Sequence, residues 1–504
     1  MSYAYLRDRE SDVFDLNKHD YPLTKHERSN STKSGQRTTD RIPGLVSPGP
    51  SPDPPYDTGS RRLVLFGLVL ALVTGSTFII IGIVIHITST SFIILHLGQW
   101  TDVALGLCFN ALVTVCTEAT GYVHGTTLKW GLAKEGRLAF NANLRLFSAT
   151  KGVFSVNGPV ANAIFLISIV FSYAASSTIF LHSSILPNFL HKKVAPTKPM
   201  ATPSSLVAFL PPIILGAMLV LQAVLSLIAF YNTRVPTWSS SPLDVTSALV
   251  YHGYVRHRPQ RCMRSVSKIK DLPADPTRPL LRQPSPWSSH KTISRIVWLV
   301  WGTLVVWVGW IIVWESTQDV GNHDISLSRI DLGLLYLAAV QTVVTIALHC
   351  CELIVTLARD EVVWRMASTP AGARPAGNPL KVALGSWQSF VLLLTKPAVH
   401  WYFGISVGVT IDKGFDITSL AMFFPIVLFL VAVYVTVVAT HRPRGPQPVA
   451  YGHVQTLADL VDEWSMIMYW GHKGDHGVGP RSICHAGTTD VRPLPPIRIE
   501  EPYA

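Results

Sequence analysis

The chain has 504 residues, of which 48% are hydrophobic and only 14% are charged. Soluble globular proteins carry about 25% charged residues, so this composition excludes an ordinary soluble protein and a chain that is disordered throughout. Lys and Arg number 42 against 31 Asp and Glu, which gives a formal net charge of +11. In a membrane protein, such an excess of basic residues first indicates how the chain is oriented across the membrane. No recognition motif accompanies it, so we expect no nucleic-acid partner.

The N-terminal segment over 1–60 is polar and ends in a Pro-rich run at 48–55. It contains no signal-peptide pattern. Its composition predicts a disordered cytoplasmic tail, because it offers little apolar surface to bury.

Eight apolar stretches, each long enough to cross about 30 Å of hydrocarbon, follow this tail. Five contain no charged residue, and they are 63–87, 160–181, 206–230, 296–314 and 417–439. Three contain one charged residue each, and they are 103–123, 332–358 and 386–409. Because charge in lipid is costly, these three could instead be interfacial or re-entrant. We predict an all-α polytopic transmembrane helix bundle of eight spans, or of seven if the segment around Lys396 is re-entrant.

The predicted spans divide the chain into four segments after the tail. They are spans one to four over 61–230, a basic Pro-rich loop over 231–295, spans five to eight over 296–439 and a C-terminal tail over 440–504. Of the 42 Lys and Arg residues, 36 fall on one side of such a bundle, five on the other and one within a span. Because positively charged loops stay in the cytoplasm, this asymmetry places both termini there. We therefore expect a multi-pass integral protein, in either the plasma membrane or an endomembrane.

One face of the span over 332–358 carries polar residues at spacings of three or four. They are Gln341, Thr345, His349, Glu352, Thr356 and Arg359. At 100° per residue they fall within about 80° of one another, and they form a stripe about 27 Å long. Such a polar stripe cannot face lipid without loss of free energy. We therefore expect it to face the bundle interior or a water-filled cavity.

The next span supplies a second polar face, with Ser389, Lys396 and His400 at spacings of seven and four. The helical rise places Lys396, Glu352 and Glu118 within about 8–14 Å of the cytoplasmic ends of their spans, together with His349. An unpaired charge inside the membrane would be neutralised or expelled. We therefore predict that Lys396 pairs with Glu352 or Glu118.

This intramembrane set has two interpretations, and its members are Glu118, Gln341, Thr345, His349, Glu352, Lys396 and His400. It forms either a pathway for protons, ions or a polar substrate, or an inert polar clamp between helices, and the frequency of buried polar contacts in bundles favours the clamp. Cys350 and Cys351 point to other helix faces than His349, so we predict no metal site and no cofactor. No nucleophile and base pair accompanies the set, and we predict that the protein is not an enzyme.

The two cytoplasmic segments carry their own patterns. The middle loop contains Arg256, Arg258, Arg261, Arg264, Lys268 and Lys270. This basic cluster either attracts anionic lipids, at about 1 kcal/mol for each basic residue near the surface, or only fixes the topology. In the tail, the pattern over 454–469 places Val454, Leu457, Val461, Trp464 and Met468 on one helical face. We predict an amphipathic helix there, docked on the bundle or lying in the membrane interface.

Three stretches in the second half of the chain carry a family resemblance. They are Leu-His-Cys-Cys-Glu-Leu through Arg-Asp-Glu at 348–361, Lys-Pro-Ala-Val-His-Trp at 396–401, and Tyr-Gly-His-Val-Gln-Thr-Leu at 451–457 with His-Ala-Gly-Thr at 485–488. In them the chain resembles uncharacterised multi-pass membrane proteins of filamentous, chiefly basidiomycete, fungi. The resemblance implies membrane localisation and no particular activity.

These observations favour a non-enzymatic membrane protein of structural or signalling type, whose bundle presents its tails and basic loop to lipids or to protein partners. The alternative is a secondary transporter or channel that uses the polar stripe. A continuous water-filled cavity along Thr345, His349 and Glu352 would favour transport, whereas a dry, sealed stripe would favour the structural role.

Overall fold

The computed structural model describes residues 58–89, 92–95, 99–143, 146–180, 205–269, 275–318, 330–374, 385–410, 414–476, 483–491 and 494–504. The predicted N-terminal tail lies outside these residues, apart from 58–60, which belong to the first helix. Lys270 of the predicted basic cluster also lies outside them.

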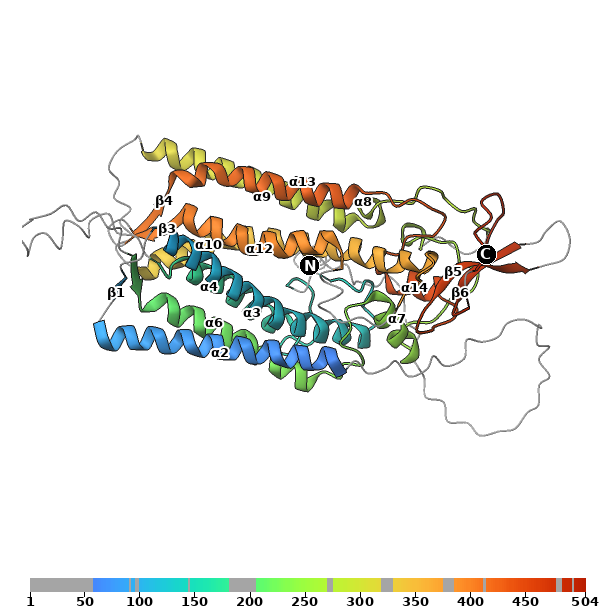
Figure 1. Ribbon diagram of the computed structural model, residues 1–504, viewed down its shortest axis with the longest axis horizontal. Coiled ribbons are helices and arrows are strands. Elements are labelled where there is room, and N and C mark those ends of the chain that lie inside the picture. The colour runs from blue at the N-terminus through green and yellow to red at the C-terminus, as the bar shows by residue number, and fades with distance from the viewer. Residues whose placement is uncertain are drawn as a thin grey trace, which may run out of the picture.

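Long helices lie side by side and run lengthwise through the molecule (Figure 1). In the described part of the chain they are α2 (Thr58–Ser89), α3 (Gln99–Lys134), α4 (Pro159–Ser177), α6 (Leu210–Asn232), α9 (Lys291–Gln318), α10 (Ile330–Arg365), α12 (Trp387–Ser406) and α13 (Phe424–Thr440). Pro stands in the first turn of α4, α6 and α13, where its missing N–H costs no hydrogen bond and its fixed φ suits the helix.

Seven helical segments among the described residues are long and apolar enough to cross a membrane. They are Ser60–Ser89, Val103–Lys134, Pro159–Ser177, Leu210–Asn232, Lys291–Ser316, Gly333–Ser368 and Ser419–Thr440. Each of them contains or overlaps a span predicted from the sequence. The chain is therefore a multi-pass membrane protein, as predicted.

Helix α12 corresponds to the remaining predicted span, and it is not one of the seven. Lys396, His400 and several aromatic residues lower its mean hydropathy. It nevertheless packs against α3, α4, α10 and α13 within the bundle (Figure 1). The predicted count of eight spans is thus not confirmed, although the helix that would be the eighth is present.

Helices α2 and α6 approach each other closely at two glycines. A Cβ atom on Gly216 would lie 2.3 Å from the carbonyl oxygen of Gly75, and a Cβ on Gly75 would lie 2.9 Å from that of Gly216. Neither position therefore accepts a side chain without moving a backbone. Small residues that admit such close approach are the usual means of helix association in lipid.

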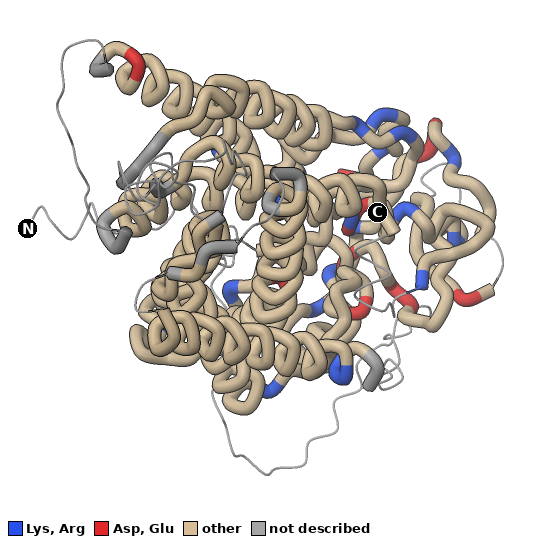
Figure 2. The backbone as a smooth tube through the Cα atoms, turned by 60° about the vertical axis from the view of Figure 1, so that its left-hand side comes forward, with Lys and Arg blue, Asp and Glu red and all other residues tan. Residues whose placement is uncertain are grey.

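The two ends of the bundle differ. At one end, β1 (Phe92–Leu95) pairs antiparallel with β2 (Ser205–Ala208), and β3 (Val407–Thr410) pairs with β4 (Gly414–Ile417). At the other end lie α7 (Pro242–Tyr251), α14 (Val454–Leu460) and the hairpin of β5 (Tyr469–His476) with β6 (Ile483–Thr489) (Figure 1). Most of the charged residues in the described part of the chain gather at this second end (Figure 2).

The middle loop and the C-terminal tail fold together at this second end. We call their described residues within 231–290 and 441–504 the loop-end domain. It has its own apolar core, which includes Leu243, Cys262, Leu457, Met468 and Tyr503, and Trp364 of α10 is buried in the same core. Backbone hydrogen bonds between Thr277 and Tyr503 join the loop to the last residues of the chain. The two segments therefore form one packed unit above the bundle.

The predicted amphipathic helix over 454–469 is wrong in its length. Helix α14 ends at Leu460, and the chain returns as strand β5 from Tyr469. Asp462 accounts for the break, because its carboxylate accepts the backbone N–H of Thr488 at 2.6 Å and thereby ties this segment to β6. The apolar face is nevertheless buried as expected for a docked segment, since Val454, Leu457 and Met468 are fully buried.

Candidate functional site

Lys396 of α12 holds two carboxylates from two other helices. Its ammonium nitrogen lies 2.6 Å from Oε1 of Glu118 on α3 and 2.9 Å from Oε2 of Glu352 on α10. The lysine side chain is 6% exposed, whereas those of Glu118 and Glu352 are 28% and 31% exposed. The sequence predicted a pair with one of the two carboxylates, and the structure contains both contacts.

His349 extends this cluster along α10. Its Nδ1 lies 3.2 Å from Oε2 of Glu352, the oxygen that also accepts from Lys396. The cluster thus contains two carboxylates, one ammonium and one imidazole. When the imidazole is neutral the cluster carries one net negative charge, and one additional proton brings it to neutrality.

The part of the stripe nearer β1 and β3 is sealed. Gln341 donates a hydrogen bond from Nε2 to Nδ1 of His400 at 2.5 Å, and the His400 ring stacks on Tyr173 with centroids 3.5 Å apart. Gln341, Thr345 and His400 are each at most 1% exposed. Over this half the stripe is therefore closed to outside solvent, as the clamp interpretation expects.

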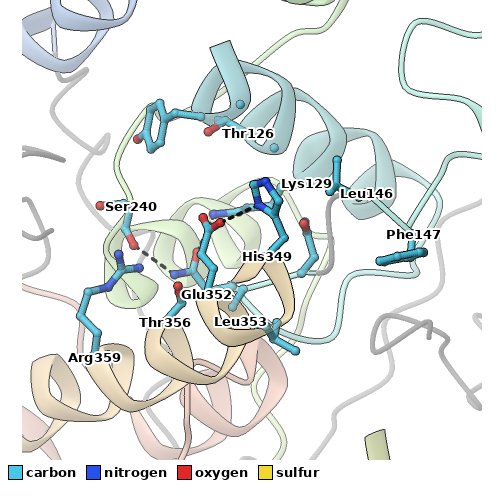
Figure 3. Close-up of a pocket in the computed structure, with 16 residues that line it drawn as sticks. Thr126, Lys129, Leu146, Phe147, Ser240, His349, Glu352, Leu353, Thr356 and Arg359 are labelled. Carbon is cyan, nitrogen blue, oxygen red and sulfur yellow. Dashed lines mark hydrogen bonds and ion pairs between the residues drawn. The ribbon is translucent and has the colours of Figure 1, made fainter. Parts of the chain in front are cut away.

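The other half of the stripe opens into a cavity of about 140 Å³. Its walls come from α3, α10, the segment around 141–147 and Ser240, and Figure 3 shows Lys129, His349, Glu352 and Arg359 around it. At about 30 Å³ for each water in the liquid, this space holds several waters or a small polar molecule. Thr345 does not line it, so this cavity does not run along the whole stripe.

A second, basic cluster occupies the cavity wall nearer the loop-end domain. Lys129 donates a hydrogen bond to Oδ1 of Asn141 at 2.7 Å, and Nδ2 of Asn141 donates to Oδ2 of Asp360 at 2.8 Å. Arg359 lies on the cavity and pairs with Oδ1 of Asp360 at 3.1 Å. Asp360 is fully buried. Arg359 thus contacts Asp360 directly and Lys129 is linked to it through Asn141, and the three ionised groups carry one net positive charge.

The cavity is thus polarised along α10. Glu352 and Arg359 are seven residues apart, which is about 10 Å along a helix axis. One end presents an excess of carboxylate and the other an excess of cation, while the six ionised groups together sum to zero when His349 is neutral. Such an arrangement can hold the anionic group of a solute at Lys129 and Arg359 and a proton or a cationic group near Glu352.

Sequence reasoning missed the α3 side of this cavity. Tyr122, Thr126 and Lys129 line it and follow Glu118 at spacings of four, four and three residues, so α3 has a polar face like that of α10. That period is the signal in the sequence that could have indicated this face. Asn141 and Ser240 lie in connecting segments, and no periodic pattern indicates them.

The described members of the basic cluster have different surroundings. Arg258 forms an ion pair with Asp459 at 2.6 Å, and Arg261 donates to the carbonyl oxygen of Ile269 at 2.9 Å. Arg264 is partly buried. Arg256 and Lys268 are exposed. The cluster is therefore partly engaged in holding the loop-end domain together, and only part of it faces outward.

Comparison with protein-family models, with curated proteins and with solved structures found no match for this chain. The resemblance to fungal membrane proteins accordingly stays a prediction.

Proposed function

We propose that this multi-pass membrane protein binds a small polar solute with an anionic group in the cavity and acts as a secondary transporter or channel, without enzymatic chemistry. One observation carries the proposal. The ionisable half of the α10 stripe opens into a cavity, where His349 and Glu352 share the walls with Lys129 and Arg359. Charged groups this far inside a membrane protein are costly, and pathways for solutes and protons are where they usually occur.

Lys129 and Arg359 are the groups that would recognise the anionic part of the solute. Asp360 takes up the Nε and Nη2 donors of Arg359, and a guanidinium has five N–H donors in all. The remaining donors point to the bidentate recognition of a carboxylate or phosphate that Arg favours. A solute that enters the cavity also displaces water. The local dielectric constant then falls, and this strengthens the contacts of the solute with Lys129 and Arg359.

The cluster around Lys396 supports coupling to protons. Glu118 and Glu352 share one ammonium, so a proton on His349 or on a carboxylate removes an uncompensated charge. Binding of a solute with positive character would remove the same charge and compete with that proton. This competition is the thermodynamic basis of proton-coupled exchange.

The topology proposed with this function has eight spans and both termini in the cytoplasm. Two observations support it: the charge asymmetry of the loops, and the position of α12 among α3, α4 and α10. An epitope at the C-terminus of a cell-expressed protein should be reached only after permeabilisation. Labelling of intact cells would contradict this topology.

A structural or signalling bundle remains the second candidate, because a specific observation favours it. Gln341, Thr345 and His400 are buried, and the Tyr173 ring stacks on His400. A permanently sealed half would make the bundle a rigid scaffold for the loop-end domain. Transport requires that this seal open in another state.

The two candidates differ in solute-dependent current. The full-length protein in proteoliposomes on a solid-supported membrane would be exposed to inorganic phosphate, small carboxylates and amino acids. Transport predicts a current with at least one class, lost in Arg359→Gln and Lys129→Gln. Arg295→Gln is the matched control, because Arg295 is exposed at the start of α9 and does not line the cavity.

Cysteine accessibility provides an independent readout that needs no substrate. In the cavity, a Thr356→Cys variant should react with a small membrane-impermeant thiol reagent faster than the wild type, whereas Thr345→Cys should not. The same solutes should protect the Thr356→Cys variant. No current and no protection with any solute class would refute transport and favour the structural bundle.

We also propose that anionic lipids associate with the basic loop, through the exposed Arg256 and Lys268 rather than through the paired Arg258. Each exposed cation near an anionic surface contributes about 1 kcal/mol. The selectivity of the protein for spin-labelled phosphatidylserine over phosphatidylcholine should fall in a variant with both residues changed to Gln. Unchanged lipid selectivity would contradict lipid binding and would mean that the basic cluster only fixes the topology.

A further inference from the structure

Three metal-ligating side chains converge on one face of the C-terminal hairpin, away from the cavity. Asp475 of β5 lies directly opposite Cys484 of β6 in the antiparallel register, so both side chains project from the same face. His472 precedes Asp475 by three residues, a spacing that normally places side chains on opposite faces of a strand. A β-bulge between His472 and Gly474 adds the extra residue that returns His472 to this face.

The ligand atoms have the separations of a tetrahedral metal site. Oδ1 of Asp475 lies 3.5 Å from Nε2 of His472 and 3.2 Å from Sγ of Cys484. All three atoms lie within 4.8 Å of one another. Zinc bonds of about 2.0–2.3 Å at tetrahedral angles separate neighbouring ligands by roughly 3.3–3.7 Å. Two of the three separations are therefore close to this range, and the third requires a shift of at most about 1 Å.

Neighbouring residues already orient these ligands. Nδ1 of His472 lies 3.1 Å from the Tyr503 hydroxyl, which directs Nε2 towards the other two ligands. Arg498 donates to both oxygens of Asp475, to Oδ2 at 3.0 Å and to Oδ1 at 3.3 Å, and this holds the carboxylate with Oδ1 beside His472 and Cys484. Outer partners of this kind are the usual support of metal ligands. His472 and Cys484 are 6% and 2% exposed, whereas Asp475 is exposed and leaves one side open.

We propose that His472, Asp475 and Cys484 bind one divalent transition-metal ion, with Zn²⁺ as the preferred ion and a water in the fourth position. The ligand types determine which metal ion is preferred. A thiolate with an imidazole and one carboxylate suits Zn²⁺ and disfavours Mg²⁺ and Ca²⁺, which take oxygen ligands. On binding, Cys484 loses its thiol proton to solvent and the metal takes its place beside Asp475.

The neighbouring His485 and Cys262 do not supply a fourth metal ligand. His485 follows Cys484 in β6 and points to the other face, where its Nε2 lies 3.3 Å from Asp462. Cys262 contacts the carbonyl oxygen of Ala504 at 3.0 Å. Because Tyr503 joins His472 to the last residues of the chain, a metal here would fasten the β5–β6 hairpin to the C-terminal segment.

The test uses the full-length protein, purified in detergent through a tag without histidine. Elemental analysis after incubation with Zn²⁺ and gel filtration should find one ion per chain. Replacement by Co²⁺ should give the thiolate-to-metal charge-transfer band in the near ultraviolet. The Co²⁺ band should be absent in Cys484→Ser, and Zn²⁺ affinity should fall at least tenfold in His472→Asn and Asp475→Asn.

Matched controls separate this site from other thiols and imidazoles. Cys108 is exposed on α3 and His252 is exposed after α7, so Cys108→Ser and His252→Asn should keep full metal content. Asp475→Asn keeps the test valid if the buried variants misfold, because Asp475 lies at the surface. No stoichiometric Zn²⁺ in the wild type, or equal affinity in wild type and Asp475→Asn, would overturn the proposal.

Discussion

Substitution of Lys396 by Met would remove the ammonium that Glu118 and Glu352 share and leave two carboxylates near each other inside the membrane. Removing one partner of a fully buried ion pair costs about 3–5 kcal/mol, whereas an exposed pair contributes at most about 1 kcal/mol. Here the lysine side chain is 6% exposed and the carboxylates are 28% and 31% exposed. The carboxylates are thus partly solvated, and we expect a loss of about 2–3 kcal/mol in the free energy of unfolding.

The assay is unfolding by SDS in mixed micelles, followed by tryptophan fluorescence. Lys134→Met is the matched control, since Lys134 is exposed at the end of α3, and it should change stability by less than about 0.5 kcal/mol. A triple variant that also contains Glu118→Gln and Glu352→Gln should recover most of the loss, because neutral groups of similar shape need no counter-ion. Equal stability of Lys396→Met and Lys134→Met, or no recovery in the triple variant, would refute this reasoning.

Two further predictions concern the α2–α6 contact and the loop-end domain. Gly216→Ala should destabilise the bundle by about 1–3 kcal/mol in the same SDS assay, because the new Cβ meets the Gly75 carbonyl oxygen, whereas Gly302→Ala meets nothing within 4 Å and should be neutral or slightly stabilising. Equal effects would show that α2 and α6 do not pack so closely. The pKa of His485 is raised to about 10, chiefly by its hydrogen bond to Asp462 and further by Cys262. Because a raised pKa stabilises the fold below the unfolded value of about 6.5, this contribution is present at neutral pH and is lost as pH rises towards 10. The difference in melting temperature between wild type and His485→Gln should therefore shrink over this pH interval, and a constant difference would contradict the ion pair.

Helical periodicity was sufficient to predict the centre of the site. The residues of α10 that contact Lys396 or line the cavity share one face because their spacing matches 3.6 residues per turn, and rise per residue gave a common depth for Glu118, Glu352 and Lys396. Pairing then followed from the cost of an isolated charge. These inferences needed no knowledge of which helices are neighbours.

The cavity could not be predicted in the same way. It exists because Asn141 and Ser240, which belong to connecting segments, close the space beside α3 and α10. Their positions depend on the tertiary packing of the loop-end domain, which leaves no periodic signal in the sequence. The seal at His400 likewise depends on the stack with Tyr173 of α4, and no pattern in the sequence indicates that these two rings meet.

The hairpin was missed for a local reason. The apolar residues from Val454 to Met468 fit a helical face, but they also become buried when the chain turns at Asp462 and returns as β5. Period alone does not distinguish these outcomes over so short a segment. Because a continuous helix is predicted over 454–469, the sequence does not predict the strand register that places His472, Asp475 and Cys484 on one face.

The ion cluster also constrains how the protein is made. Lys396 follows Glu118 by 278 residues, so at about 5–20 residues per second the ribosome needs roughly 15–60 s to supply the ammonium after the carboxylate has been synthesised. During that interval α3 enters the bilayer without its counter-ion. The contact between Glu118 and Lys396 therefore cannot form until α12 has been translated. The ion cluster joins the first half of the bundle to the second, and it is complete only when both halves have been made.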